Sequence, residues 1–148
     1  MPDLSNEAAM GRVIIKVKIS NYGDQLAVSE GRKRLEEVRQ VEVEGLVDTG
    51  ATLVVLPEGI VRQLGLTINR TAPVIYADGR VGEIEVAGGA YLEIKRRYAE
   101  VECLVEKDTD QVLIGQVPLE VMDWHVDLKE RTLKPRPGWP DAPLLEVF

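Results

Sequence analysis

Cysteine and histidine, the side chains that build disulfides and most transition-metal sites, are almost missing from this sequence. Its 148 residues contain one cysteine, Cys103, and one histidine, His125. A single cysteine cannot form an internal disulfide, which fits a reducing compartment, and we expect a cytoplasmic protein. One histidine among scattered acids offers too few ligands to hold a metal ion, so we expect neither a metal site nor a cofactor.

Long apolar runs and an excess of positive charge are missing too. Residues 1–12 are polar where a signal sequence would be apolar, and no apolar run approaches the length of a membrane span. The chain carries 18 Lys+Arg against 25 Asp+Glu, a net charge of -7. Because nucleic acids and anionic membranes bind clustered cations, we expect neither as a partner. The densest basic cluster, Arg32-Lys33-Arg34, is crowded by glutamates and is interpreted as a solvated stretch.

What the sequence does contain is a series of short strand patterns. β-branched or alternating segments predict strands over residues 12–19, 41–47, 73–86, 91–94, 98–105, 111–115, 126–128 and 132–134. One short helix is predicted through Ile60, Val61 and Leu64, with Pro57 at its start and Gly65 as its C-cap. Residues 118–124 fit a helical turn or two. The polar segment 20–37 is either a long loop or a short helix through residues 31–37.

These elements predict a mostly β domain, a closed or sandwiched sheet with one or two short helices. The length suits a single domain. Four of the eight prolines fall in residues 135–143. We therefore expect one domain over residues 1–134, followed by a Pro-rich tail over residues 135–148 whose last residues, 144–148, are again apolar.

The stretch LVDTGATLVVL, residues 46–56, places a lone acid, Asp48, between apolar flanks. Burial there disfavours the ionised form, and a second carboxylate alongside would give a pair that shares one proton. Such a pair can act as base and acid at once on a water and a carbonyl. The chain has no second Asp-Thr-Gly. If the chemistry is hydrolysis, the partner acid must come from a second copy of the chain, related by a two-fold axis.

Three segments, in this order, resemble the retropepsin-type aspartic proteases, single-lobed homodimers, in a form found in bacteria. They are the Asp-Thr-Gly-Ala segment 46–51, the Asp-Gly hairpin 76–81 and the Val-Leu-Ile-Gly segment 112–115. The resemblance covers most of residues 12–134. It implies that each chain folds as a closed β-barrel of the acid-protease type. It also implies that two chains form a homodimer that acts on a peptide or protein substrate.

The resemblance also implies roles for individual residues. Asp48 would be the catalytic acid, contributed once by each subunit. Thr49, Gly50 and Ala51 would form the active-site loop. Thr49 would make cross-subunit hydrogen bonds, and Gly50 would line the cleft. The remaining implied positions are a flap formed by Tyr76, Ala77, Asp78, Gly79 and Arg80, and a support for the loop formed by Leu113, Ile114 and Gly115.

Two features depart from the family pattern. The flap tip is less Gly-rich than in viral members and carries Asp78 and Arg80, which bears on its mobility and on its preferred substrates. The charged segment 21–40 has no role that the resemblance explains. The tail is open to three interpretations: a disordered segment, a strand of the dimer interface, or a product-like peptide lying in a cleft.

We therefore expect a homodimeric aspartic endopeptidase that hydrolyses peptide bonds by water attack. The main alternative is a dimer of the same fold that binds peptides or serves in assembly without catalysis. Residues 48–53 also resemble the Asp-x-Asp-x-Thr-Leu loop of haloacid-dehalogenase-like phosphatases, with Gly50 in place of the second Asp. That fold needs strands and helices in alternation around a parallel sheet, and this chain has too few helices.

Overall fold

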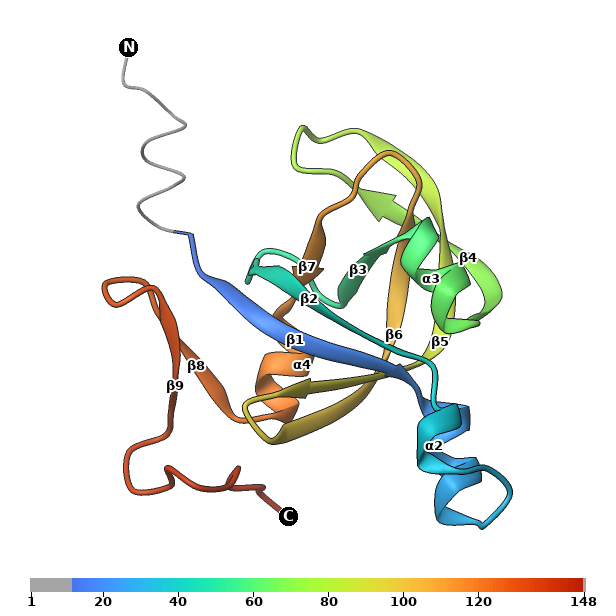
Figure 1. The fold of residues 1–148 in the computed structure, drawn as a ribbon. Helices are drawn as coiled ribbons and strands as arrows, with labels where there is room; N and C mark the ends of the chain where they lie inside the picture. The colour runs from blue at the N-terminus through green and yellow to red at the C-terminus, as the bar shows by residue number, and fades with distance from the viewer. Residues whose placement is uncertain (1–11, 148) are drawn as a thin grey trace.

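The computed structural model describes residues 12–147, and its main feature is a seven-stranded sheet (Figure 1). The sheet consists of β1 (Ile14–Asn21), β2 (Gln40–Val47), β3 (Val54–Pro57), β4 (Thr67–Ile75), β5 (Val81–Ile94), β6 (Arg97–Glu106) and β7 (Val112–Ile114). A two-stranded sheet of β8 (Trp124–Asp127) and β9 (Thr132–Pro135) follows. The helices are α2 (Tyr22–Ser29), the 3-10 turn η1 (Leu35–Glu37), α3 (Glu58–Leu64) and α4 (Gln116–Val121).

The main sheet closes on itself. Its order is β1-β2-β7-β3-β6-β5-β4, and β1 also pairs with β5, so six strands form a ring and β4 lies outside it. The predicted mostly β, closed barrel with short helices is confirmed. The phosphatase alternative is wrong, because its parallel sheet with alternating helices is not this architecture.

Alternation along the strands places apolar side chains inside the barrel. In β1, Ile15, Val17 and Ile19 are buried while Ile14 and Lys16 are exposed. Burying each large aliphatic side chain stabilises the fold by about 2 kcal/mol. Cys103 lies in this core on β6, where burial raises the pKa of its thiol to about 12 and keeps it protonated.

The helix of the polar segment and the strand that follows the hairpin differ from the prediction. The helix in the polar segment is α2, over Tyr22–Ser29, and residues 35–37 form only the 3-10 turn η1. β5 is one strand where the sequence predicts two, because Gly88 and Gly89 form a bulge that shifts its register with β6 and leaves the strand unbroken. Gly89 has a φ of 82°, which is costly for a residue with a side chain.

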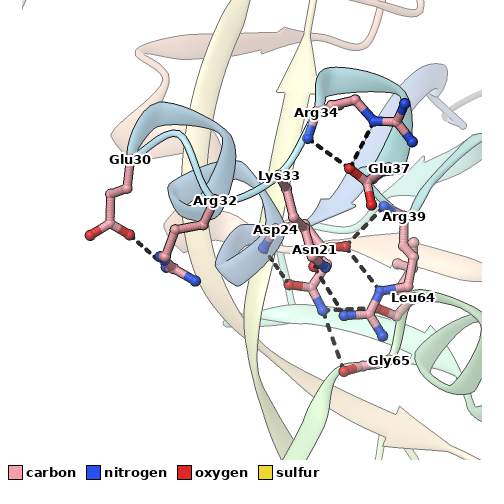
Figure 2. Close-up of polar contacts among 10 residues, drawn as sticks. All are labelled: Asn21, Asp24, Glu30, Arg32, Lys33, Arg34, Glu37, Arg39, Leu64 and Gly65. Carbon is pink, nitrogen blue, oxygen red and sulfur yellow. Dashed lines mark hydrogen bonds and ion pairs between the residues drawn. The ribbon is translucent and has the colours of Figure 1, made fainter.

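Asn21 bonds the charged segment 21–40 to the end of α3, and Asp24 holds the segment together (Figure 2). The Asn21 side chain accepts from the backbone N–H of Asp24 at 2.9 Å and donates to the carbonyl of Leu64 at 2.9 Å. The buried Asp24 carboxylate accepts from Nε of Arg39 at 2.9 Å and pairs with Lys33. The hydrogen bonds from Arg39, above all, hold the pKa of Asp24 well below its ordinary value.

The Pro-rich tail is bonded to the barrel through Arg97 and Asp123. The buried Arg97 guanidinium lies 4.2 Å from the Trp124 ring centroid and donates to the carbonyl of Trp139 at 3.0 Å. Asp123 accepts from the backbone N–H of Leu144 at 3.1 Å. Residues 136–147 form turns and bends and contain no strand. No helix within residues 12–147 is long and apolar enough to span a membrane.

Candidate active site

The loop that carries Asp48 connects β2 to β3 across the end of β7. β7 lies between these two strands, so Ile114 is opposite Val47 of β2 and also opposite Val54 of β3. The backbone N–H of Asp48 continues the pairing by donating to the carbonyl of Ile114 at 2.9 Å. Because both ends of the loop are held by one short buried strand, the barrel fixes the position of Asp48.

Helix α4 holds the loop from behind. The backbone N–H groups of Gln116 and Val117 donate to the carbonyls of Ala51 and Thr52, each at 2.9 Å. The first N–H groups of a helix have no acceptor within the helix, and here the loop carbonyls satisfy two of them. The loop and the helix therefore complete each other's backbone hydrogen bonds.

Gly115, between β7 and α4, has to be glycine for a steric reason. A Cβ atom built there would overlap the carbonyl oxygens of Ala51 and Leu53. The absence of a side chain lets the backbone of the loop lie directly against the backbone at the start of α4. This contact is the physical basis of the support that Leu113, Ile114 and Gly115 give the loop.

The Asp48 carboxylate lies in a tight turn at the surface of the single chain. Its Oδ1 accepts from the backbone N–H of Gly50 at 3.0 Å, and the N–H of Ala51 donates to the Asp48 carbonyl at 3.1 Å. Asp48 is half-buried, whereas Thr49 and Gly50 are exposed. The turn orients the carboxylate and leaves its two neighbours open to contact from outside the chain.

The β4–β5 hairpin ends in the predicted Asp-Gly turn and projects from the barrel at the top of Figure 1. Tyr76 and Arg80 close the turn through a backbone hydrogen bond of 2.8 Å, and Gly79 has a φ of 86°. Asp78 Oδ1 accepts from the N–H of Arg80 at 2.9 Å, and the Arg80 guanidinium lies 4.4 Å from the Tyr76 ring centroid. Both charged residues that depart from the family pattern, together with Ala77, thus belong to a self-contained tip.

The structure brings two of the three predicted groups into direct contact, the Asp48 loop and the segment Leu113–Gly115. The third, Tyr76–Arg80, makes its hydrogen bonds and ion pairs within the tip, as far as the described residues go. Within residues 12–147, no group of three or more His, Cys, Asp or Glu side chains is arranged to hold a metal ion.

The backbone N–H groups of Gln116 and Val117 belong to this site, although the sequence pattern did not predict their contact with the loop. It placed the helical turns at residues 118–124, whereas α4 spans Gln116–Val121. Because α4 begins directly after Gly115, its first N–H groups have no acceptor within the helix and bond the loop carbonyls. A predicted helix start at residue 116 would have indicated this contact.

Comparison with known proteins identifies the family of the chain. Residues 15–120, more than half of the chain, match the family described as gag-polyprotein putative aspartyl protease. The matched region includes the Asp48 loop, the β4–β5 hairpin and β7. The chain belongs to this family of aspartyl proteases, and the resemblance seen in the sequence is confirmed.

A solved structure with a similar chain is the solution structure of the Simian Foamy Virus (mac) protease. It shares 15% sequence identity with this chain at a TM-score of 0.45, over 71% of this chain and 91% of the viral one. None of the curated proteins matches the chain.

Proposed function

We propose that two copies of the chain form one aspartic endopeptidase, with Asp48 of each copy in a shared catalytic pair. The observation that carries the proposal is the single Asp-Thr-Gly turn, fixed by β7 and α4 yet open at the surface of one chain. Family membership supports peptide hydrolysis as the chemistry. Since one chain supplies one such acid, a two-fold axis beside Thr49 and Gly50 completes the pair.

The paired carboxylates carry one proton between them, because two like charges side by side cannot both ionise. The unprotonated Asp48 takes a proton from a water molecule, whose oxygen bonds to the scissile carbonyl carbon. The protonated Asp48 of the other copy gives its proton to the carbonyl oxygen. The C–N bond then breaks as the nitrogen takes a proton from one carboxyl and a hydroxyl returns a proton to the other.

The other residues of the site have positioning roles in this proposal. The exposed Thr49 hydroxyls form hydrogen bonds across the axis and hold the two turns in register. Gly50 lets the substrate backbone approach the acids, and the Tyr76–Arg80 tip closes over an extended peptide, which pairs with the hairpin as a strand. The tip is held by Asp78 and Arg80, so we expect it to move as one unit.

The first experiment is a mass-spectrometric cleavage profile on a mixed peptide library, between about pH 4 and about pH 7. Wild type, Asp48→Asn and Asp110→Asn are compared. Asp110 is an exposed acid outside the site, so its variant removes one carboxyl from the surface as a matched control. We expect cleavage by wild type and by Asp110→Asn with a bell-shaped pH dependence, and none by Asp48→Asn.

Equal cleavage by wild type and Asp48→Asn would remove Asp48 from the mechanism and point to a contaminating protease. If sedimentation shows a dimer and neither protein cleaves any library peptide, the alternative of a peptide-binding or assembly dimer replaces the enzyme.

A further inference from the structure

A groove of about 530 Å³ lies along the outer part of β1, away from the Asp48 loop. Its floor is the first half of β1, from Ile14 to Lys18, and one wall is the β5–β6 turn at Lys95 and Arg96. Thr132 of β9 also lines it. None of the residues of the candidate active site lines this groove.

The backbone of β1 is open along this groove. β1 pairs with β2 along Ile14–Ser20, but with β5 only from Lys18 onward, because β5 has already turned into β6. The Val47 N–H donates to the Val13 carbonyl, so alternation points the N–H and C=O groups of Ile14 and Lys16 away from β2 and into the groove. No strand within the described part of the chain pairs with this edge. An unpaired edge of this kind accepts an added strand.

The groove carries a net positive charge, whereas the whole chain is negatively charged. Lys16, Lys18, Lys95 and Arg96 line it against two acids, Glu42 and Glu93, in a protein of net charge -7. The ion pairs of residues 12–147 include none of the four cations. Lys95 instead donates to the hydroxyl of Thr132, another lining residue, at 3.3 Å.

The side chains of β1 specify a pattern for the added strand. Lys16 and Lys18 point outward, while Ile15 and Val17 point inward. A strand laid along this edge alternates between the same two faces. Acidic side chains at every second position would meet the lysines, with apolar side chains between them on the inner face.

We propose that this groove binds an extended acidic segment of the protein substrate, outside the cleaved bond, by adding it as a strand to β1. The assignment to a substrate rests on the proposed function. It is supported by position, because Ile14 lies opposite Leu46, two residues before Asp48, so one polypeptide can reach both sites. The groove would then select protein substrates by a feature distinct from the scissile residues.

The binding test uses full-length protein carrying Asp48→Asn, so that no cleavage occurs. The probe is a fluorescein-labelled peptide of alternating Glu and Val, measured by fluorescence anisotropy at low ionic strength. In this Asp48→Asn background, the double substitution Lys16→Glu with Lys18→Glu should weaken binding of the peptide about tenfold or more. Arg62→Glu with Lys107→Glu makes the same change in net charge at exposed positions outside the groove and should leave the affinity unchanged.

A second pair of probes tests strand addition itself. N-methylation of alternate residues removes the N–H donors and should weaken binding about tenfold, whereas a Lys–Val peptide should not bind. Equal binding of the methylated and unmethylated probes, or equal loss in both double variants, would overturn the proposal in favour of unspecific charge attraction. A dimer that dissociates on Lys16→Glu with Lys18→Glu would overturn it in favour of a second copy in the groove.

Kinetics of wild type on two cleavable peptides, with and without an acidic arm, test the link to the substrate. The double substitution Lys16→Glu with Lys18→Glu should raise KM only for the peptide that carries the acidic arm, and should leave kcat unchanged. An equal effect on both peptides would overturn the substrate assignment. If no peptide is cleaved at all, the proposed function fails and the substrate assignment falls with it, while the anisotropy result still reports separately on strand addition.

Discussion

Gly115 is the residue at which the backbone of the Asp48 loop comes closest to the rest of the barrel. We predict that Gly115→Ala lowers the free energy of unfolding by about 2 kcal/mol and impairs catalysis, because the new methyl group displaces the loop carbonyls of Ala51 and Leu53. Urea unfolding and the cleavage assay measure the two effects.

Gly59→Ala is the matched control for this substitution. A Cβ at Gly59 meets no atom within 4 Å, and the residue lies in α3, so alanine should stabilise the protein by up to about 1 kcal/mol. If Gly115→Ala were as stable and active as wild type, the close contact of Gly115 with the loop carbonyls would be needed for neither folding nor catalysis.

Asp24 is the most strongly paired acid of the charged segment. Asp24→Asn should lower the free energy of unfolding by about 2 kcal/mol near neutral pH, because it removes a buried charge from its hydrogen bonds with Arg39. The folded pKa of Asp24 lies below the unfolded one, so its contribution is present above about pH 4 and is lost as the pH falls further. Urea unfolding near pH 7 and near pH 3 measures the difference.

The exposed pair Glu30–Arg32 beside it provides the comparison (Figure 2). Both side chains are mostly in water, where an ion pair contributes little, so Glu30→Gln should leave the unfolding midpoint unchanged. A gap between wild type and Asp24→Asn that stays constant into acid would contradict the assignment of the effect to the Asp24 charge.

At the residue level, the sequence predicted those features that have a local cause. Gly65 ends α3 with a φ of 64°, and Gly79 occupies the tight turn of the hairpin, because both positions need a backbone conformation that glycine adopts easily. The roles of Asp24 and Arg97 were not predictable, because their partners lie 15 and 42 residues away along the chain.

Among the elements, the Pro-rich tail makes a clear test of the predicted domain boundary. Deletion of residues 136–148 removes the Trp139 carbonyl from the buried Arg97 and the Leu144 N–H from the buried Asp123. Buried charged groups without their partners are costly, and we predict a loss of about 3 kcal/mol in the free energy of unfolding. Urea unfolding of the truncated and full chains measures it.

Deletion of residues 147–148 alone is the control, since Val147 is 92% exposed. Equal stability of all three proteins would place the end of the folded domain near residue 134, with the tail as a dispensable addition.

The sequence and the structure agree best where an element is stabilised by its own residues. The β4–β5 hairpin follows from alternation and an Asp-Gly turn, and α3 follows from its apolar face and its two end residues. Helix α2 was not predicted, because its stability comes from the Asn21 cap and from Asp24 bound to distant partners. The tight turn at Asp48-Thr-Gly was predicted from a motif, whereas the contact of this loop with α4 required the three-dimensional structure.

For the whole molecule, the decisive prediction concerns concentration. If the Asp48 pair is shared between two chains, specific activity should fall on dilution through the dissociation range, in proportion to the fraction of dimer. Cleavage rates over a dilution series, set against sedimentation of the same samples, measure this. Activity strictly proportional to total chain down to full dissociation would contradict a shared site.

The long strand β5 belongs to two structures at once, the projecting hairpin and the closed barrel. From Val81 to Ile84 it pairs only with β4, whereas from Ala90 to Glu93 it is held between β1 and β6 and closes the barrel. Between these parts, Glu85, Val86 and Ala87 pair with both β4 and β6, and the Gly88–Gly89 bulge then interrupts the pairing with β6. The outer half of the hairpin is thus joined to the barrel only at its base. A displacement of the tip therefore requires no change in the strand pairs that close the barrel.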